Sequence, residues 1–337
     1  MVKRLCCVVL VVSMFSCVTE DIEENTRQGN FEMLWRVLDE HYCFFDYKNK
    51  EYGLDWDEVH DRYARQVSDT MNSTQLFDLM ADMTRELRDG HVNLSSAMDN
   101  ARYGAWFDDF PANYSDSLER LTLGRVTDYR STGVLKYKIL RDSIGYVRCA
   151  TFDGGLGDGN LSAMFKQLKD CVGLVIDVRN NSGGSLETAM TFASAFLDEK
   201  TVVGYMQHKT GKGHSDFSTP QAIEIEPCST VHWLRPVVIL TNRRCYSATN
   251  AFVMFMQAIK PRMTTVGDKT GGGSGLPFSS ELPLGWRIRF SASPMLDLQQ
   301  NHTEFGIVPD VKVDITSDDY ARGYDTILQT ALDIFKK

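Results

Sequence analysis

Two segments far apart in the chain carry the residue types that acyl transfer requires. Residues 177–184 read Asp-Val-Arg-Asn-Asn-Ser-Gly-Gly, residues 244–250 read Arg-Cys-Tyr-Ser-Ala-Thr-Asn, and each follows an apolar run. The glycine turn can present backbone N–H groups to a carbonyl oxygen, and Ser247 supplies a hydroxyl at the start of a predicted helix. A serine hydrolase needs both an oxyanion trap and a nucleophile. These segments therefore suggest acyl-transfer chemistry.

Each candidate residue also has a plain structural explanation. Ser247 could simply cap the helix that follows it, and the double glycine could form an ordinary turn. His91 could be an ordinary surface residue in a loop, and it can act as a general base only if Ser247 lies within hydrogen-bond reach. Glu304 carries a carboxylate that could orient a histidine or a water molecule. The hypothesis of a catalytic site depends on these features occurring together.

The pattern of apolar residues predicts how these candidates are positioned. Strand patterns cover residues 134–140, 145–149, 173–178 and 237–241, and helical patterns cover residues 161–168, 186–197 and 248–259. Strands alternating with helices indicate an α/β domain with a mixed or parallel sheet. Residues 31–98 show helical spacing and predict a small helical domain, with His91 just past its last helix. The candidate base and the candidate nucleophile therefore come from different parts of the fold.

Composition and motifs exclude several other functions. The chain has 337 residues and a net charge of −9, which disfavours nucleic-acid binding. It has no Walker A loop, no HExxH, no GxGxxG in a βαβ context and no GxSxG elbow. Three of its eight cysteines lie near the N-terminus, and the other five form no CxxC pair, so neither a disulfide framework nor a zinc site is expected. No metal or organic cofactor is predicted.

The N-terminus has the pattern of an export signal. Lys3-Arg4 precedes a short apolar run that ends at Ser16-Cys17, and acidic residues follow almost at once. This segment resembles a bacterial lipoprotein signal, with Cys17 as the lipidated first mature residue, and the acidic stretch resembles surface-export signals of Bacteroidetes lipoproteins. The alternative is an ordinary secretory signal with a chance cysteine. We expect a signal at residues 1–17, an acidic linker at 18–30, the helical domain at 31–98 and the catalytic domain at 99–337. The resemblance implies a lipid-anchored protein of the cell envelope, at the outer membrane, with the periplasmic and the surface-exposed side left open.

The order of the motifs resembles a known family. Strand-DxRxNxGG-helix, then strand-TNxxxxSATN-helix, then ExGIxPD is similar to the tail-specific (C-terminal processing) protease and tricorn-core family of serine peptidases. Leu-Arg-Asp-Gly-His-Val, which contains His91, resembles the histidine segment of the tricorn-like branch. The resemblance covers roughly residues 31–315 and implies a crotonase-like (ClpP-like) α/β catalytic domain.

The resemblance also implies roles for individual residues. Ser247 matches the nucleophile, His91 the general base, and Glu304 the carboxylate of the charge network. The oxyanion hole corresponds to the N–H groups of Ala248 and of one of Gly183 or Gly184. Lys269 is the alternative base, although processing proteases place their lysine about three residues later, where this chain has glycine.

Further departures from the family leave alternatives open. Asn250 replaces the usual acidic residue, Gly90 stands where tricorn has a serine, and no PDZ-like insertion is evident. The favoured interpretation is a serine endopeptidase that cleaves peptides or protein tails through an acyl-enzyme. A catalytically inactive surface lipoprotein that binds peptide or glycan is the alternative, and an esterase with the same machinery is a third hypothesis.

Overall fold

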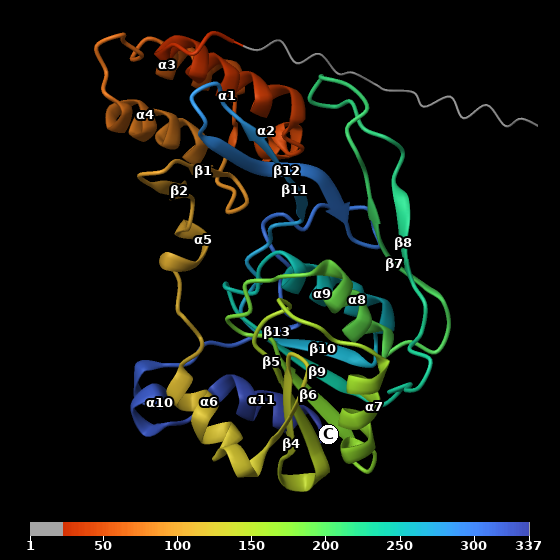
Figure 1. Cartoon of the computed structure of the whole chain (residues 1–337). Helices are drawn as coiled ribbons and strands as arrows, with labels where there is room; N and C mark the ends of the chain where they lie inside the picture. Colours follow the sequence, from red (N-terminus) through yellow and green to blue (C-terminus); the bar gives the residue numbers. More distant parts are fainter. Residues whose placement is uncertain (1–22, 337) are drawn as a thin grey trace, which may run out of the picture.

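The computed structural model describes residues 23–336, which form two lobes (Figure 1). One lobe holds the N-terminal helices α1–α4, and the other holds the large sheet and the C-terminal helices. Cys17 and the predicted export signal lie outside the described residues.

The larger lobe is built on a seven-stranded sheet in the order β13-β10-β9-β6-β5-β4-β3. Its strands are β3 Arg130–Thr132, β4 Leu135–Ile139, β5 Ile144–Cys149, β6 Gly173–Asp177, β9 Val237–Thr241, β10 Met263–Gly267 and β13 Val311–Lys312. From β13 to β5 all neighbouring strands are parallel, whereas β4 and β3 pair antiparallel at one edge. Every residue of β5, β6 and β9 is buried, as expected of strands covered on both faces.

Helices cover both faces of this sheet. The helices are α6 Asp116–Leu123, α7 Asp158–Leu168, α8 Leu186–Ser194, α9 Ala248–Met256, α10 Ser317–Arg322 and α11 Thr326–Ile334. Side chains of α7, α8 and α9 form one apolar core with alternate residues of the central strands, such as Val147 and Ile176. Side chains of α6 and α11 form a second core with the intervening residues, such as Tyr146 and Val175. The predicted α/β, crotonase-like fold is confirmed.

The smaller lobe combines four helices with strands from distant parts of the chain. Its elements are α1 Arg27–His41, α2 Phe45–Tyr52, α3 Trp56–Ala64, α4 Ser73–Arg85, β1 Asn93–Ser95, β2 Asn100–Arg102, β11 Gly275–Glu281 and β12 Arg287–Leu296. Strand β12 pairs with β1 on one side and β11 on the other, and Ile288 and Phe290 are part of the core under the helices. The predicted helical unit is therefore completed by a small sheet whose β11 and β12 come from residues 275–296.

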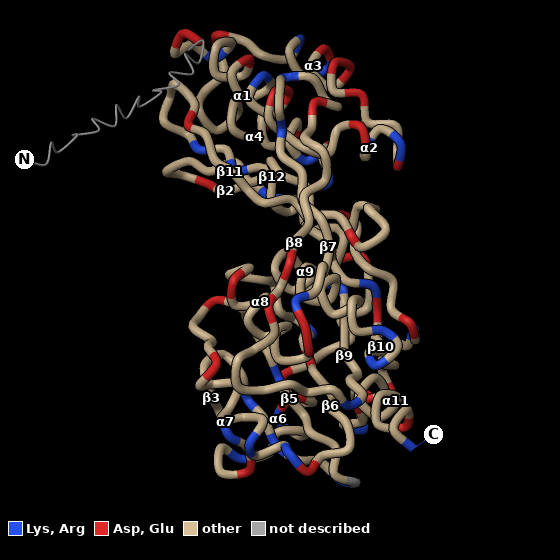
Figure 2. The backbone as a smooth tube through the Cα atoms, turned by 90° about the vertical axis from the view of Figure 1, so that its right-hand side faces the viewer, with Lys and Arg blue, Asp and Glu red and all other residues tan. Residues whose placement is uncertain are grey.

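A long hairpin links the two lobes. Strands β7 Thr201–Met206 and β8 Gln221–Ile225 rise from the large lobe, and β12 pairs with β7 at Met295 and Leu296. The loop of this hairpin reaches the helices: His214 bonds to Asp39 at 2.7 Å and stacks on Phe45 with ring centroids 4.3 Å apart. Figure 2 shows the lobes meeting at a narrow waist where β7 and β8 pass. Between α4 and α6, the chain crosses between the lobes through the short helix α5 Ala105–Asp108.

Several general features complete the description of residues 23–336. Cys43, Cys149, Cys171, Cys228 and Cys245 are buried and unpaired. No cluster of three or more potential metal-ligating side chains is found in this range. Within the same range, no helix has the length and apolar character needed to cross a membrane.

Candidate active site

Ser247 lies in a strained turn between β9 and α9. Its backbone has φ 57° and ψ −123°, a region that non-glycine residues rarely occupy. Its side chain makes no capping hydrogen bond to helix α9, although the residue stands at the N-cap position. The alternative that the Ser247 hydroxyl serves only as a helix cap is therefore wrong, and the turn leaves Oγ available.

The glycine run after β10 holds this turn in place. Gly272 has φ +81°, and its carbonyl accepts a 2.9 Å hydrogen bond from the Ser247 N–H. A Cβ on Gly273 would lie 2.3 Å from the ring of Tyr246, and one on Gly272 would lie 1.8 Å from the Glu304 carbonyl oxygen. Only glycine allows these close approaches. The run therefore packs against the nucleophile turn.

His91 reaches Ser247 across the junction of the lobes. Its Nε2 lies 2.9 Å from Ser247 Oγ, although the residues are 156 positions apart. The ring is buried, and its Nδ1 has no hydrogen-bond partner among the described residues. Burial lowers the pKa of His91 to about 4, against the opposing effect of Asp89. The imidazole is therefore neutral at neutral pH, and with its proton on Nδ1 it can accept the Ser247 hydroxyl proton.

Asp89 is the carboxylate next to the candidate base, and its role was not predicted from the sequence. Oδ1 accepts hydrogen bonds from the His91 backbone N–H at 2.7 Å and from the Tyr246 hydroxyl at 3.2 Å. Oδ2 accepts from the hydroxyls of Tyr42 at 3.0 Å and Ser291 at 2.8 Å. Asp89 thus links Tyr246, the residue before the candidate nucleophile, to His91, the candidate base. Its position two residues before His91 was the available signal.

One buried cation serves two buried carboxyl groups. Lys48 is fully buried, and its Nζ lies 3.4 Å from Glu304 Oε1 and also bonds the Leu87 carbonyl. Burial acts to raise the pKa of Asp89, but Lys48, His91 and hydrogen bonds outweigh it and hold that pKa below its usual value. Burial and the charge of Asp89 raise the pKa of Glu304 to about 8. Asp89 is therefore ionised at neutral pH while Glu304 retains its proton.

The structure does not bring Glu304 into hydrogen-bond contact with His91. Its Oε2 accepts the Ser274 N–H at 2.9 Å, and its Oε1 faces Lys48. Burial, followed by the charge of Asp89, raises the pKa of Glu304, so Glu304 is neutral beside the Asp89 carboxylate at neutral pH. Of the two roles expected for Glu304, the contact with the histidine is made instead by Asp89, through the His91 backbone, and the ordering of a water molecule stays a prediction.

Two segments that carry backbone N–H groups adjoin Ser247, the start of α9 and the glycine turn after β6. Ala248 is the first residue of α9, and its N–H has no acceptor among the described residues. The Gly183 N–H is occupied, because it donates to Asn181 Oδ1 at 2.9 Å, whereas that of Gly184 has no acceptor in the same range. A Cβ on Gly183 would lie 2.9 Å from Ser247 Cβ, so the glycine turn directly adjoins the nucleophile. Of the two glycines, Gly184 is the one with an available donor.

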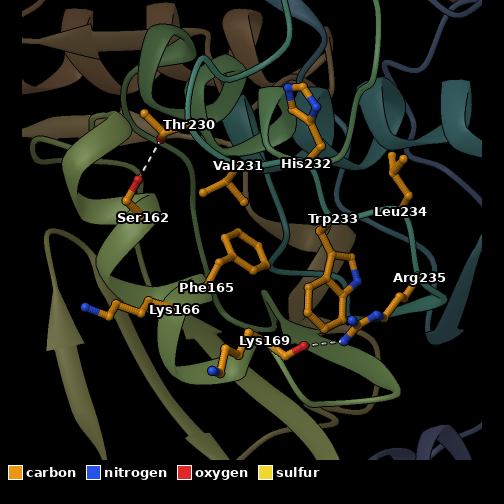
Figure 3. A pocket seen from close by; sticks show the side chains of 10 residues that line it. All are labelled: Ser162, Phe165, Lys166, Lys169, Thr230, Val231, His232, Trp233, Leu234 and Arg235. Carbon is orange, nitrogen blue, oxygen red and sulfur yellow. Dashed lines mark hydrogen bonds between the residues drawn. The ribbon is translucent and has the colours of Figure 1, made fainter.

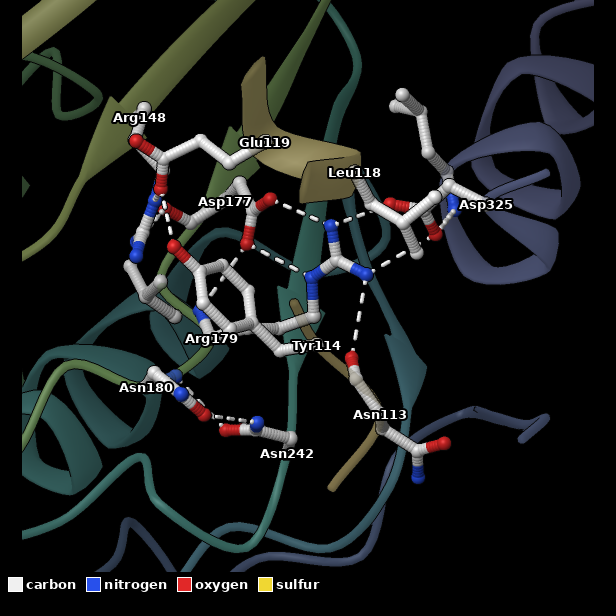
Figure 4. Close-up of polar contacts among 12 residues, drawn as sticks. Asn113, Tyr114, Leu118, Glu119, Arg148, Asp177, Arg179, Asn180, Asn242 and Asp325 are labelled. Atoms are coloured by element: carbon white, nitrogen blue, oxygen red, sulfur yellow. Dashed lines mark hydrogen bonds and ion pairs between the residues drawn. The ribbon is translucent and has the colours of Figure 1, made fainter. Parts of the chain in front are cut away.

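A buried ion network anchors the glycine turn (Figure 4). Arg179 bonds Asp177 through Nε at 2.9 Å, and it bonds Asp325, the N-cap residue of α11, through Nη1 and Nη2 at 3.0 and 2.8 Å. Its Nη1 also donates to the Asn113 carbonyl oxygen at 3.3 Å. The Asp and Arg of the DxRxN motif therefore fix the end of β6 against the C-terminal helix, which positions the loop carrying the oxyanion donors.

The departures from the family pattern have local explanations. Asn250 accepts from Thr270 at 2.6 Å and donates to Thr303 Oγ1 at 3.1 Å, so a neutral side chain is fully bonded there. A Cβ on Gly90 would lie 2.0 Å from Trp106, which excludes the serine found in tricorn. Lys269 lines a cavity beside the site, and no hydrogen bond joins it to Ser247 among the described residues.

A second cavity lies away from the catalytic pair. It has a volume of about 460 Å³ and is lined by α7 and residues 230–235 (Figure 3). Its Ser162 hydroxyl donates to Thr230 at 2.7 Å, and its His232 Nε2 contacts the Cys228 carbonyl at 2.9 Å. Serine and histidine in this cavity therefore bond to other groups and form no nucleophile–base pair.

Two family profiles match the sequence. The profile of peptidase family S41 matches residues 143–313, and that of the tricorn protease C1 domain matches residues 23–85. The carboxyl-terminal-processing protease of Synechocystis sp. is 28% identical over 198 residues, which is 57% of this chain and 44% of that relative. The chain thus spans less than half the length of this curated relative.

Solved structures share the fold over nearly the whole chain. A candidate peptidase from Parabacteroides merdae is 50% identical with a TM-score of 0.87, covering 92% of this chain and 97% of that one. Mature CPAF has a TM-score of 0.68 at 12% identity, covering 93% of this chain and 97% of its own. At 12% identity, the similarity to mature CPAF shows a shared fold alone.

Proposed function

This chain belongs to peptidase family S41 and is a serine-type peptidase, and from this premise we propose that it cuts peptide bonds through an acyl-enzyme formed on Ser247. The observation that carries the proposal is the 2.9 Å contact between Ser247 Oγ and His91 Nε2, made by residues from opposite lobes. A nucleophile in a strained turn, facing a neutral imidazole, is the arrangement that covalent catalysis requires.

The steps follow from the positions of these atoms. Ser247 Oγ attacks the scissile carbonyl carbon while its proton passes to His91 Nε2. The N–H groups of Ala248 and Gly184 bind the oxyanion of the tetrahedral intermediate. The carbon–nitrogen bond then breaks, and the proton on His91 goes to the leaving amine. Water attacks the ester in the same way, giving its proton to His91, and the carboxylate product leaves as the serine hydroxyl is restored.

Asp89 has a positioning role in this scheme. Its ionised carboxylate lies beside the base and favours the imidazolium that forms when His91 takes the proton. Lys48 compensates the buried charge of Asp89, and Glu304, which holds its own proton near neutral pH, adds no second negative charge. The roles of Lys48 and Glu304 are therefore electrostatic.

Peptides or protein tails are the proposed substrates, as the names of the processing-protease relatives suggest. The test is hydrolysis of a synthetic peptide library by the full chain, read by mass spectrometry. Ser247→Ala is expected to abolish hydrolysis while leaving the unfolding transition unchanged. Ser162→Ala is the matched control, because its hydroxyl bonds Thr230 away from the site. Full turnover by Ser247→Ala would remove the assignment.

We also propose that the protein is lipid-anchored at Cys17 in the cell envelope. The basic residues, short apolar run and Ser16-Cys17 support this proposal. Metabolic labelling with an alkyne fatty acid is expected to mark the wild-type protein, while Cys17→Ala remains unlabelled. Equal labelling of both proteins would contradict the proposed site.

A further inference from the structure

A cavity of about 300 Å³ opens beside the catalytic pair. Its walls include Gly90, the neighbour of His91, and Tyr246, the neighbour of Ser247. Both lobes contribute, because Tyr52 and Arg88 come from the helical lobe while Lys269 follows β10 of the large sheet. Any molecule bound in this cavity therefore lies within a residue or two of the reacting groups.

Three cationic side chains line this cavity. Lys269 is half-buried, and its ammonium group makes no hydrogen bond or ion pair with the residues that the structure describes. The Arg88 guanidinium lies over the Tyr52 ring, 4.2 Å from its centroid, and pairs with no carboxylate in that same range. Arg243 bonds Asp268 through Nε at 3.0 Å and stacks on Phe110 at 3.7 Å. Two of the three cations thus lack a counterion.

The acidic groups of the cavity do not balance these cations. Glu51 and Glu304 are its carboxyl groups, and the pKa of Glu304 is raised to about 8 by burial and by Asp89. With Arg243 paired to Asp268, Glu51 is at neutral pH the one lining carboxylate available to the two cations without a counterion, Lys269 and Arg88. The chain as a whole has a net charge of −9, so a cavity with an excess of positive side chains differs in sign from the protein around it.

Aromatic side chains and one hydrogen-bond donor without an acceptor also line the cavity. Trp106 stacks on Tyr246 with ring centroids 4.7 Å apart, and Phe305 and Tyr103 also line the cavity. The Trp106 indole N–H is buried without an acceptor among the described residues. Such a combination of apolar walls with a few convergent donors is typical of a ligand pocket.

The sheet order places this cavity on the side of the leaving group. The loop after β9 carries Ser247, the loop after β6 carries the oxyanion glycines, and the loop after β10 carries Lys269. Strand β9 lies between β6 and β10, so the cavity and the oxyanion donors flank Ser247 on opposite sides. His91 follows the cavity-lining Gly90, and the base of a serine peptidase delivers its proton to the leaving amine. The departing fragment therefore faces the cationic wall.

We propose that this cavity binds a carboxylate of the leaving peptide, held by Lys269 together with Arg88 and Arg243. The inference rests on the proposed peptidase function and adds a specificity-determining site to it. The carboxylate has two sources, the C-terminus of the substrate or an acidic side chain just after the cut bond. Both present the same group to the same cations.

Direct binding to the Ser247→Ala full chain tests the proposal without requiring turnover. The first probe pair is the tripeptide Ala-Ala-Phe with a free C-terminus and with an amidated one. The second pair is Ala-Glu-Phe amide and Ala-Gln-Phe amide. Calorimetric titration is expected to show at least one carboxylate probe binding about tenfold to a hundredfold more tightly than its neutral match, as charge-assisted hydrogen bonds allow. The first pair reports the terminal carboxylate, and the second reports the side chain.

Matched variants assign the effect to this cavity. Adding Lys269→Met or Arg88→Gln is expected to reduce the ratio of affinities toward one, whereas Arg244→Gln, which changes an exposed arginine outside the cavity, keeps it. Equal affinity within both pairs, no binding of any probe, or a ratio unaffected by Lys269→Met and Arg88→Gln would overturn the proposal. Cleavage by the wild-type protein is measured separately, so a failure of the peptidase function is distinguished from a failure of this site.

Discussion

Replacing Asp89 by asparagine is expected to slow reaction at Ser247 without unfolding the protein. The amide keeps the shape of the carboxylate and can still accept the His91 N–H, now 2.7 Å from Oδ1. Its Nδ2 would face the hydroxyls of Tyr42 and Ser291, which can rotate to become acceptors. The free energy of unfolding should fall by about 1–3 kcal/mol, the cost of imperfectly matched buried hydrogen bonds.

The effect on reactivity comes from the lost charge. Asp89 raises the pKa of His91 against the lowering effect of burial, so it stabilises the imidazolium that forms as Ser247 is deprotonated. Two unit charges on the order of 5 Å apart interact by about 3 kcal/mol at an effective dielectric constant of about 20. That energy corresponds to a rate loss of about a hundredfold.

The assay is the second-order rate of labelling by a fluorophosphonate as a function of pH. In the wild type, the acid limb should lie near pH 4, because His91 has a pKa of about 4 and is protonated only below it. In Asp89→Asn the labelling rate should fall, and the acid limb of the pH profile should move to still lower pH, because Asp89 no longer raises the pKa of His91. If the substitution instead loosened the packing, water would enter the site and raise the pKa of His91 toward its ordinary value, so the acid limb would move to higher pH.

An exposed aspartate provides the control for this comparison. Asp82→Asn on α4 should keep both the rate and the profile, since Asp82 is largely solvent-exposed. A folded Asp89→Asn protein that is labelled at the wild-type rate would refute the reasoning.

Three further predictions follow from buried groups around the site. Glu304 binds a proton in the folded state up to about pH 8 and in the unfolded state only up to about pH 4.5, so the free energy of unfolding should fall as pH rises between these values. Thermal unfolding of Glu304→Gln, followed over the same pH range, should lack this decrease. A decrease equal to that of the wild type would contradict the raised pKa of Glu304. Arg179→Gln leaves Asp177 and Asp325 without their cation and should lower the free energy of unfolding, measured in denaturant, by about 3–5 kcal/mol. A decrease below about 1 kcal/mol would show that this ion network does not stabilise the fold. In Gly184→Ala the new Cβ would lie 2.3 Å from the Asp153 nitrogen at a residue with φ +133°, so the backbone must shift and move the Gly184 N–H. Loss of this oxyanion donor should slow fluorophosphonate labelling about a hundredfold to a thousandfold. Labelling at the wild-type rate would exclude Gly184 as a donor.

The central strands and helices of the large lobe could be predicted because each is specified locally. Residues 145–149, 173–178 and 237–241 are mostly apolar, with Arg148 and Asp177 as the charged exceptions, which is the pattern expected of strands buried on both faces. The structure has β5, β6 and β9 at these places, with α7, α8 and α9 at the predicted helices. The sheet of the smaller lobe was not predicted, because β12 pairs with β1, whose residues lie almost 200 positions earlier, and β11 joins this sheet through β12.

The candidate site shows a similar division. Serine, histidine and the glycine turn are marked by their motifs, so they could be singled out before their distances were known. Lys48 lies in the polar segment Tyr-Lys-Asn-Lys-Glu and has the sequence context of a surface lysine, yet it is fully buried against aromatic rings. Of the four hydrogen bonds to Asp89, one comes from the nearby His91 N–H, and the other three come from Tyr42, Tyr246 and Ser291, which only the fold brings close. Electrostatic partners of this kind depend on long-range packing.

The most direct test of the central claim is fluorophosphonate labelling of the folded wild-type chain and of His91→Ala, with the labelled peptide identified by mass spectrometry. The account predicts that the probe is found on Ser247 in the wild type and that labelling of His91→Ala falls by at least about a hundredfold. Labelling of His91→Ala at the wild-type rate, or no labelling of the native protein, would contradict an active serine with His91 as its base.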